Sequence, residues 1–364
     1  VETPLVETVA AETLVAKPAA AAAETEWADV EEVMTSGGDW PQWGGTREKN
    51  NVPGVKDIPI SWNIGKFDRS TGDWDNSKAE NIRWYSRLGS QTYGNPVVAG
   101  GSVFVGTNNG AGHLKRYPSQ VDLGCLLAFD ETSGEFLWQH SSEKLITGRV
   151  HDWPLQGICC APLVEGERLW FVTSRGEVRC LDTKGFYDGE DDGPVKDEEA
   201  FVAEIMNAGP TAQVHTDTLS GLGEGLLIEE AKAILAGAGE AAEGEVKIES
   251  VTAGKVWKAT GNFGGVDRQL TIKQIGPRIS FFKALGIQDK RDADVIWVFN
   301  MMEQLGTSQH NMASCSVTSY GKYLFVNTSN GLDESHINLP APSAPSFICM
   351  NKDTGCLLYT SPSP

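Results

Sequence analysis

Apolar and polar residues alternate over short distances along most of this chain, and glycine, asparagine and proline separate the alternating runs. This pattern predicts short β-strands joined by tight turns. The segment GNPVVAGGSVFVGTNNG at 94–110 is the clearest example. A short apolar strand is followed by a glycine turn and then by a second strand rich in valine and phenylalanine. We therefore expect a β-hairpin here and a mainly β fold.

The same hairpin pattern occurs twice more, at CAPLVEGERLWFVTSRG (160–176) and SCSVTSYGKYLFVNTSNG (314–331). The three copies align with Pro96, Pro162 and Ser316 in register. Each hairpin is followed by further strand-like sequence, at 126–139, 178–185 and 347–359. A unit of four short strands that recurs along a chain is typical of the blades of a β-propeller.

The turn between the third and fourth predicted strands carries its own repeated residues. A small residue occupies one position, and an Asp or Asn follows two residues later, as in Ala128 and Asp130. The Asp or Asn side chain can accept backbone N–H bonds in the turn, and a glycine such as Gly134 can adopt positive φ. The equivalent residues in the other units are Cys180, Asp182, Cys349, Asn351 and Gly355.

These turn residues resemble the tryptophan-docking signature of the pyrroloquinoline-quinone (PQQ) type propellers, Ala-x-Asp-x-x-Thr-Gly-x-x-x-Trp. AFDETSGEFLW at 128–138 matches it, with Ser133 in the Thr position and Trp138 at the end. CMNKDTGCLLY (349–359) matches with Asn and Tyr substituted, and CLDTKG keeps the front half. DWPQWGG at 39–45 is similar to the opening of secreted PQQ-like repeat proteins.

The resemblance covers residues 39–185 and 292–355 and implies an all-β propeller of four-stranded blades. Three recognisable blades are fewer than the family uses, so we expect an incomplete ring. Residues 292–300 parallel 79–87, and we expect both segments to lead into the next blade.

Three segments do not follow the repeat. Residues 1–38 are rich in Ala and Glu and are expected to form a disordered acidic tether. Residues 186–291 combine an acidic linker with helical and strand-like patterns, which predicts a small α+β insertion or an atypical blade. Residues 356–364 end in CLLYTSPSP and have the character of a non-native tail derived from adapter sequence.

Charge and composition narrow the classes of partner. The net charge of −19 argues against nucleic acid and anionic membrane surfaces as partners. No apolar run is long enough for a transmembrane segment, and seven cysteines in 364 residues do not form a disulfide framework. The start at Val1 has the character of a processed or clipped end.

In a propeller, the loops that precede the inner strands gather on one face around the axis. Here these loops are 90–96, 148–162 and 306–316, and together they form the candidate axial face. Convergent polar and aromatic side chains make this face a candidate binding site. The alternative is that these side chains only hydrogen-bond one another. The candidate residues are Tyr93, Asn95, Arg149, His151, Asp152, Trp153, Gln156, Cys159, Cys160, His310 and Asn311.

Individual motifs on this face are less specific. Residues adjacent in sequence, such as His151 and Asp152, rarely face each other, so they do not form a ready-made acid/base pair. His151 and His310 have no recognised metal-ligand spacing, so no metal site is predicted. Cys159 and Cys160 could form a redox-active vicinal disulfide. We favour the interpretation that they are small buried residues of the core, because Cys180 and Cys349 stand in their units at the position that Ala128 occupies in the first. No hydrolase motif is present.

Three functions fit these observations. The leading hypothesis is an extracytoplasmic binding or assembly scaffold, periplasmic or secreted and tethered through the N-terminal segment, with a protein partner. The alternative is a PQQ- and calcium-dependent alcohol or sugar dehydrogenase, the activity that the resemblance implies, although none of the family's calcium ligands maps onto a numbered residue here. The weaker alternative is a carbohydrate-binding propeller that stacks its ligand on Trp153 and Tyr93.

Overall fold

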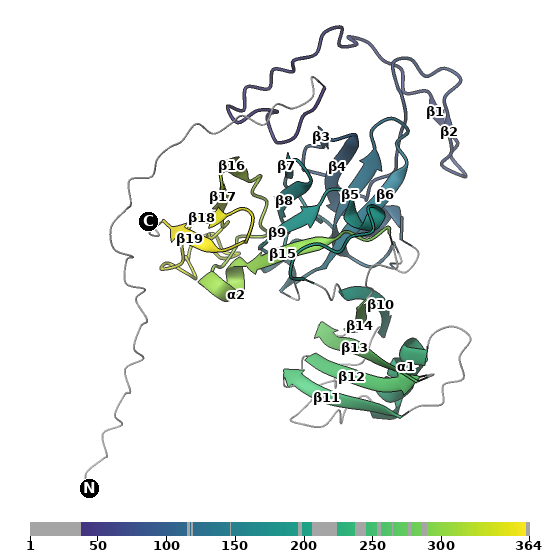
Figure 1. Ribbon diagram of the computed structural model, residues 1–364, viewed down its shortest axis with the longest axis vertical. Coiled ribbons are helices and arrows are strands. Elements are labelled where there is room, and N and C mark those ends of the chain that lie inside the picture. Colours follow the sequence, from purple (N-terminus) through teal and green to yellow (C-terminus); the bar gives the residue numbers. More distant parts are fainter. Residues whose placement is uncertain are drawn as a thin grey trace, which may run out of the picture. The chain divides into compact units, whose positions relative to one another are not determined.

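The computed structural model describes residues 38–361 with gaps at 115–116, 118, 146, 196–198, 206–223, 237–244, 253–255, 264, 276–277 and 285–289. The expected acidic tether therefore lies outside the described residues except for Gly38. The described chain contains three four-stranded antiparallel sheets and one five-stranded sheet, shown in Figure 1. Within this part of the chain, no helix is long and apolar enough to cross a membrane.

The first blade contains β3 (Val97–Ala99), β4 (Ser102–Asn108), β5 (Leu123–Asp130) and β6 (Phe136–Glu143) in sequence order. The predicted hairpin forms β3 and β4, which pair from Val97 with Phe104 to Ala99 with Ser102. Asp130 ends β5, and its carboxylate accepts the backbone N–H groups of Thr132 and Ser133 at 3.0 and 2.7 Å. These bonds lower the pKa of Asp130 and fix the turn into β6.

The second blade contains β7 (Leu163–Glu165), β8 (Arg168–Val172), β9 (Glu177–Asp182) and β15 (Val295–Asn300). Its fourth strand comes from beyond the whole insertion. Residues 292–300, which we expected to lead into the next blade, form the outer strand of the second blade and are followed along the chain by α2 and the third blade. β15 pairs antiparallel with β9, from Val295 with Leu181 to Asn300 with Glu177. The reason is burial, because the apolar side chains of β15 pack into the cores on either side of the second blade.

The third blade contains β16 (Thr318–Tyr320), β17 (Tyr323–Asn327), β18 (Phe347–Asn351) and β19 (Leu357–Thr360). Residues from the segment expected to be a non-native tail form the outer strand, where Cys349 pairs with Tyr359. Residues 362–364 lie outside the described residues. An α-helix, α2 (Met301–Leu305), precedes this blade and is capped by Asn300, whose side chain accepts the N–H of Glu303.

Residues of the insertion form an α+β element. It contains β10 (Glu199–Ile205), α1 (Glu224–Ala236), β11 (Val246–Thr252), β12 (Val256–Phe263), β13 (Val266–Ile275) and β14 (Arg278–Ala284). The strand order is β10-β14-β13-β12-β11. Ala231 and Leu235 of α1 pack with Trp257, Leu270 and Ile272 of the sheet in a core of their own.

The remaining elements are short. β1 (Lys66–Phe67) and β2 (Trp74–Asp75) pair as a two-stranded sheet. Three 3₁₀ turns lie at Asn109–Ala111, Gly148–Val150 and Gly185–Tyr187.

Neighbouring blades pack through their apolar faces. Phe104 and Trp138 of the first blade share a core with Phe171 and Leu181 of the second. Trp170 and Val178 of the second blade similarly share a core with Leu324, Val326 and Ile348 of the third. Strands buried on both faces, as in β5, follow from this arrangement.

A tryptophan of one element docks on the turn of the next blade at three places. The indole N–H groups of Trp84, Trp138 and Trp297 donate to the carbonyls of Glu131, Thr183 and Lys352 at 2.7, 3.0 and 3.1 Å. Each ring lies against a glycine, and a Cβ added at Gly134 would lie 2.4 Å from the Trp84 ring. The β-propeller fold predicted from the sequence is confirmed, with an incomplete ring.

Candidate functional site

The loops of the predicted axial face contact one another. The N–H of Trp153 donates to the carbonyl of Asn311 at 2.9 Å, and the N–H of Asn311 donates to the carbonyl of Val150 at 3.1 Å. The N–H of Ala161 donates to Ser316 Oγ at 3.0 Å. Loop 90–96 also contacts loop 148–162, since a Cβ at Gly94 would lie 2.4 Å from the Cys160 carbonyl. The structure therefore brings all three loops together.

Most polar side chains of this face are hydrogen-bonded within it. His151 Nε2 lies 3.2 Å from Ser308 Oγ, and burial lowers the pKa of His151. The Gln309 amide donates to the carbonyls of His151 and Ser174, the second at 2.7 Å. The Arg149 guanidinium covers the Trp153 ring, 4.3 Å from its centroid. The Trp153 ring is thus already stacked by a residue of the same loop.

His310 and Asn311 form a small group next to these contacts. The His310 Nδ1 donates to the carbonyl of Leu332 at 2.9 Å, which leaves Nε2 to accept the Asn311 amide at 3.2 Å. The His310 ring also lies edge-on against His336, with ring centroids 4.6 Å apart. Both ring nitrogens are therefore engaged.

The other candidate residues differ in exposure. Tyr93 is 62% exposed, and its hydroxyl lies 3.2 Å from Gln91 Oε1. Asn95 is exposed and Gln156 is half-buried.

Cys159 and Cys160 are separate thiols. The buried Cys160 Sγ donates to the carbonyl of Val172 at 3.2 Å and accepts its N–H at 3.4 Å. Burial raises the pKa of Cys160 to about 12 and that of Cys159 to about 11. Thiols with such pKa values carry almost no thiolate near neutral pH, so neither residue is poised as a nucleophile.

The residues of the axial face do not fit the calcium and quinone that the resemblance implies. A hard cation needs several oxygen ligands, preferably carboxylates. Asp152 is the one carboxylate among the candidate residues. It is buried, accepts the Leu145 N–H at 2.9 Å and forms an ion pair with Lys144. No group of three or more His, Cys, Asp or Glu side chains among the described residues is placed to hold a metal ion.

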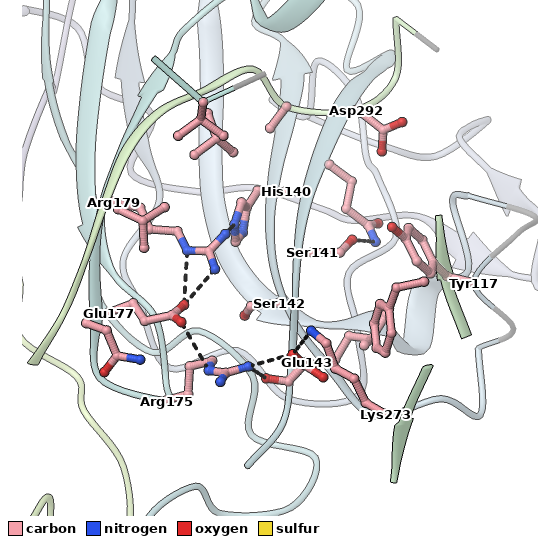
Figure 2. A pocket seen from close by; sticks show the side chains of 18 of the residues that line it. Tyr117, His140, Ser141, Ser142, Glu143, Arg175, Glu177, Arg179, Lys273 and Asp292 are labelled. Atoms are coloured by element: carbon pink, nitrogen blue, oxygen red, sulfur yellow. Dashed lines mark hydrogen bonds and ion pairs between the residues drawn. The ribbon is translucent and has the colours of Figure 1, made fainter. Parts of the chain in front are cut away.

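A cavity of about 540 Å³ lies along the fourth strand of the first blade (Figure 2), and none of the candidate axial-face residues lines it. Side chains of β6, β9, β15 and α2 line it, and Lys273 and Phe282 of the insertion complete the lining. His140 of β6 is among the lining residues and is 3% exposed.

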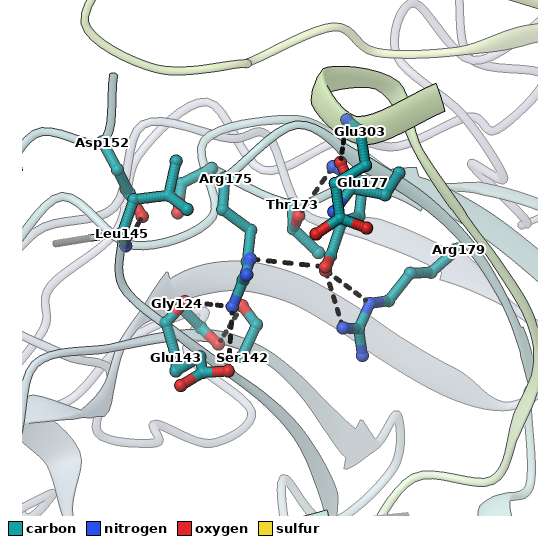
Figure 3. Close-up of polar contacts among 12 residues, drawn as sticks. Gly124, Ser142, Glu143, Leu145, Asp152, Thr173, Arg175, Glu177, Arg179 and Glu303 are labelled. Atoms are coloured by element: carbon teal, nitrogen blue, oxygen red, sulfur yellow. Dashed lines mark hydrogen bonds and ion pairs between the residues drawn. The ribbon is translucent and has the colours of Figure 1, made fainter. Parts of the chain in front are cut away.

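A network of ion pairs lies within the lining, as Figure 3 shows in part. Arg175 lies 3.2 Å from Glu143 and 3.3 Å from Glu177, and Arg179 lies 2.6 Å from Glu177. Lys273 reaches Glu143 at 2.7 Å. Burial alone would raise the pKa of Glu177, but Arg179 and Arg175 outweigh it, so the pKa is lowered and the carboxylate stays ionised.

Four-stranded antiparallel sheets, apolar cores between adjacent blades and tryptophans docked on the following turn together decide the fold class. The fold is that of a β-propeller with an incomplete ring, whose turns are covered by docked tryptophans.

No protein-family model and no curated protein matches the propeller. Among solved structures, it is similar to a quinohemoprotein alcohol dehydrogenase from Comamonas testosteroni (10% identity, TM-score 0.32, 91% of this chain and 42% of that one). It is also similar to BamB from Moraxella catarrhalis (12%, 0.18, 76% and 63%) and to a europium-containing methanol dehydrogenase (11%, 0.24, 92% and 59%). The propeller spans less than two thirds of the length of each of these chains.

The residues of the cavity lie outside the axial loops that the sequence predicted as the binding site. The sequence carries one signal for these residues, which is the presence of charged side chains in a blade strand that should be buried on both faces. Glu177 and Arg179 stand two residues apart on β9, which places them on one face of the strand. Buried charges are normally paired or functional, so charged residues at alternate positions of a blade strand indicate a polar site on that face.

Proposed function

We propose that this propeller is a binding or assembly scaffold for a protein partner in an extracytoplasmic compartment. The observation that carries the proposal is the state of the axial face, whose polar groups are mostly bonded to one another. Gln309 and Asn311 are examples, and His151 is bonded through Nε2, while His151 Nδ1 and Gln309 Oε1 are buried without a partner among the described residues. The one carboxylate of this face, Asp152, is buried and paired with Lys144, so the face does not present the carboxylate ligands that a calcium-dependent quinone enzyme uses.

Exposed apolar side chains on the N-terminal side of the first blade support a protein partner. Ile58, Ile60, Trp62 and Ile64 are 56, 98, 69 and 53% exposed and occupy alternate positions in the sequence. Clusters of exposed large apolar residues are typical of protein-interaction sites. The partner we propose therefore contacts residues 58–64 with apolar side chains of its own.

The alternative dehydrogenase function can be tested directly. The chain is incubated with PQQ and calcium, desalted, and examined for quinone absorbance and for dye-linked oxidation of alcohols and sugars. The scaffold proposal expects no retained quinone at micromolar concentration and no turnover. Retained quinone with turnover would overturn it.

A photo-cross-linking experiment tests the partner surface. A photoreactive amino acid is placed at Ile60 and, as a matched control, at Ile337, which is 79% exposed. In the cell envelope of the source organism, one discrete protein adduct is expected from position 60 and none from position 337. The purified adduct partner should bind the unmodified chain and bind Ile60→Asp at least tenfold more weakly. The same adducts from both positions, or none from either, would contradict the proposal.

A further inference from the structure

The cavity along β6 combines both signs of charge in its lining. The charged side chains are Arg175, Arg179, Lys273, Glu143, Glu177, Asp292 and Glu303. The three cations are paired with the carboxylates of Glu143 and Glu177 at 3.3 Å or less. An anionic or cationic ligand would have to displace one member of such a pair, and leaving a buried charge without its partner is costly.

A neutral ligand rich in hydroxyl groups does not have this cost. Each hydroxyl donates one hydrogen bond and accepts others, so it can use a carboxylate acceptor and a guanidinium donor together. Arg175 and Arg179 present planar forks of N–H groups, and Glu177 between them presents acceptor oxygens. A neutral ligand can therefore hydrogen-bond to the N–H groups and the carboxylate oxygens of these ion pairs without displacing either partner.

His140 supplies an independent indication of a ligand. Its Nε2 lies 2.7 Å from Arg179 Nη1. Because arginine only donates, Nε2 is the acceptor and the proton is on Nδ1. Burial, with the nearby Arg179 charge, holds the pKa of His140 well below its ordinary value, so the ring is neutral. Nδ1 is buried and has no hydrogen-bond partner among the described residues, and buried donors in folded proteins are normally satisfied.

Apolar side chains are interspersed among the polar residues of the lining. Tyr117, Leu123 and Phe282 line the cavity together with Val295 and Val298. A sugar ring has a C–H face that packs on such groups while its hydroxyls reach the polar wall. The volume of about 540 Å³ lies within the range of about 300–1,000 Å³ typical of small-molecule sites.

We propose that this cavity is a binding site for a neutral sugar or polyol, with the His140 Nδ1–H, the guanidinium groups of Arg175 and Arg179 and the Glu177 carboxylate hydrogen-bonding its hydroxyls. The insertion contributes Lys273 and Phe282, so it completes a site that the blades alone would leave open. This site is separate from the proposed protein-binding segment, and its test is independent of that proposal.

Calorimetric titration of the whole chain tests the proposal. The probes are methyl glycosides of neutral hexoses, their disaccharides and glycerol, with glucuronate as the anionic control and glucosamine as the cationic control. The variants are His140→Phe, which keeps an aromatic ring and removes the donor, and Gln304→Trp, which adds bulk at an exposed lining residue. Gln120→Trp is the matched control, because Gln120 is exposed and does not line the cavity.

At least one neutral probe should bind the unmodified chain. His140→Phe should weaken binding about tenfold, the effect of one lost buried hydrogen bond. Gln304→Trp should also weaken it, and Gln120→Trp should not. If His140→Phe does not fold, Gln304→Trp decides the outcome. The proposal would be overturned if no neutral probe bound, or if a charged control bound more tightly than the neutral probes. It would also be overturned if Gln304→Trp and Gln120→Trp bound the probe with equal affinity.

Discussion

Replacing Gly134 by alanine should destabilise the first blade through the docked indole of Trp84. Gly134 has φ of +73°, and a Cβ there would lie 2.4 Å from the Trp84 ring. Gly100, in the β3–β4 turn of the same blade, has φ of +57° and no heavy atom within 4 Å of an added Cβ. Gly100→Ala is therefore a matched control with a left-handed backbone and no steric conflict.

The two substitutions share one cost and differ in another. Placing a residue with a Cβ in the left-handed region costs about 1–2 kcal/mol at either position. Gly134→Ala also has to displace the Trp84 ring, and overpacking of this kind costs typically about 1–3 kcal/mol. The Trp84 N–H bond to the Glu131 carbonyl, 2.7 Å long, is strained by the same movement. We expect Gly134→Ala to lower the free energy of unfolding by about 2–5 kcal/mol and Gly100→Ala by about 1–2 kcal/mol.

Equilibrium unfolding in urea, followed by tryptophan fluorescence and by circular dichroism, measures both values. Removing the ring in the background of Trp84→Ala should bring the cost of Gly134→Ala down to that of Gly100→Ala. Equal destabilisation by the two alanine substitutions in the otherwise unmodified chain would refute the docking argument.

Three further outcomes are expected. Cys356, which is exposed, should react with iodoacetamide at neutral pH well before Cys159, whose pKa burial raises to about 11; equally fast labelling of both in peptide mass maps would contradict this. Burial raises the pKa of Asp182 to about 6 in the folded chain, above its ordinary value of 3.8, so the fold binds more protons than the unfolded chain between these values. Stability should therefore fall as pH rises from about 4 to 6, and Asp182→Asn should flatten that part of the urea-midpoint profile. Glu177→Gln leaves two arginines without their shared carboxylate and should cost about 3–5 kcal/mol, whereas Glu167→Gln, in an exposed pair, should leave the urea midpoint nearly unchanged; similar urea midpoints for the two variants would count against the buried network.

Much of the fold was predictable because its signals are local. Alternating apolar residues, a glycine turn and an Asp or Asn in the next turn lie within a few residues of one another, and the structure forms β3 to β6 from such a run. The gathering of the axial loops followed from the blade repeat, and the structure adds that Gln309 and His151 are bonded to each other. Whether that face binds a ligand stays a prediction.

The cavity was not predictable in the same way. Lys273 and Glu143 are 130 positions apart, and no local pattern links them. The orphaned Nδ1 of His140 depends on Arg179 occupying Nε2, which only the packing of β6 against β9 arranges. Charged residues on a blade strand were visible in the sequence, but their partners were not.

The sequence by itself determined the blade units and their docking turns, because side-chain alternation and turn chemistry act between neighbours in the chain. Only the tertiary structure decided which strand closes the second blade. β15 takes that place across the whole insertion because burial of its apolar side chains on β9 outweighs proximity along the chain. The same long-range packing brings Lys273 and Phe282 of the insertion to the cavity, where the proposed sugar site is formed.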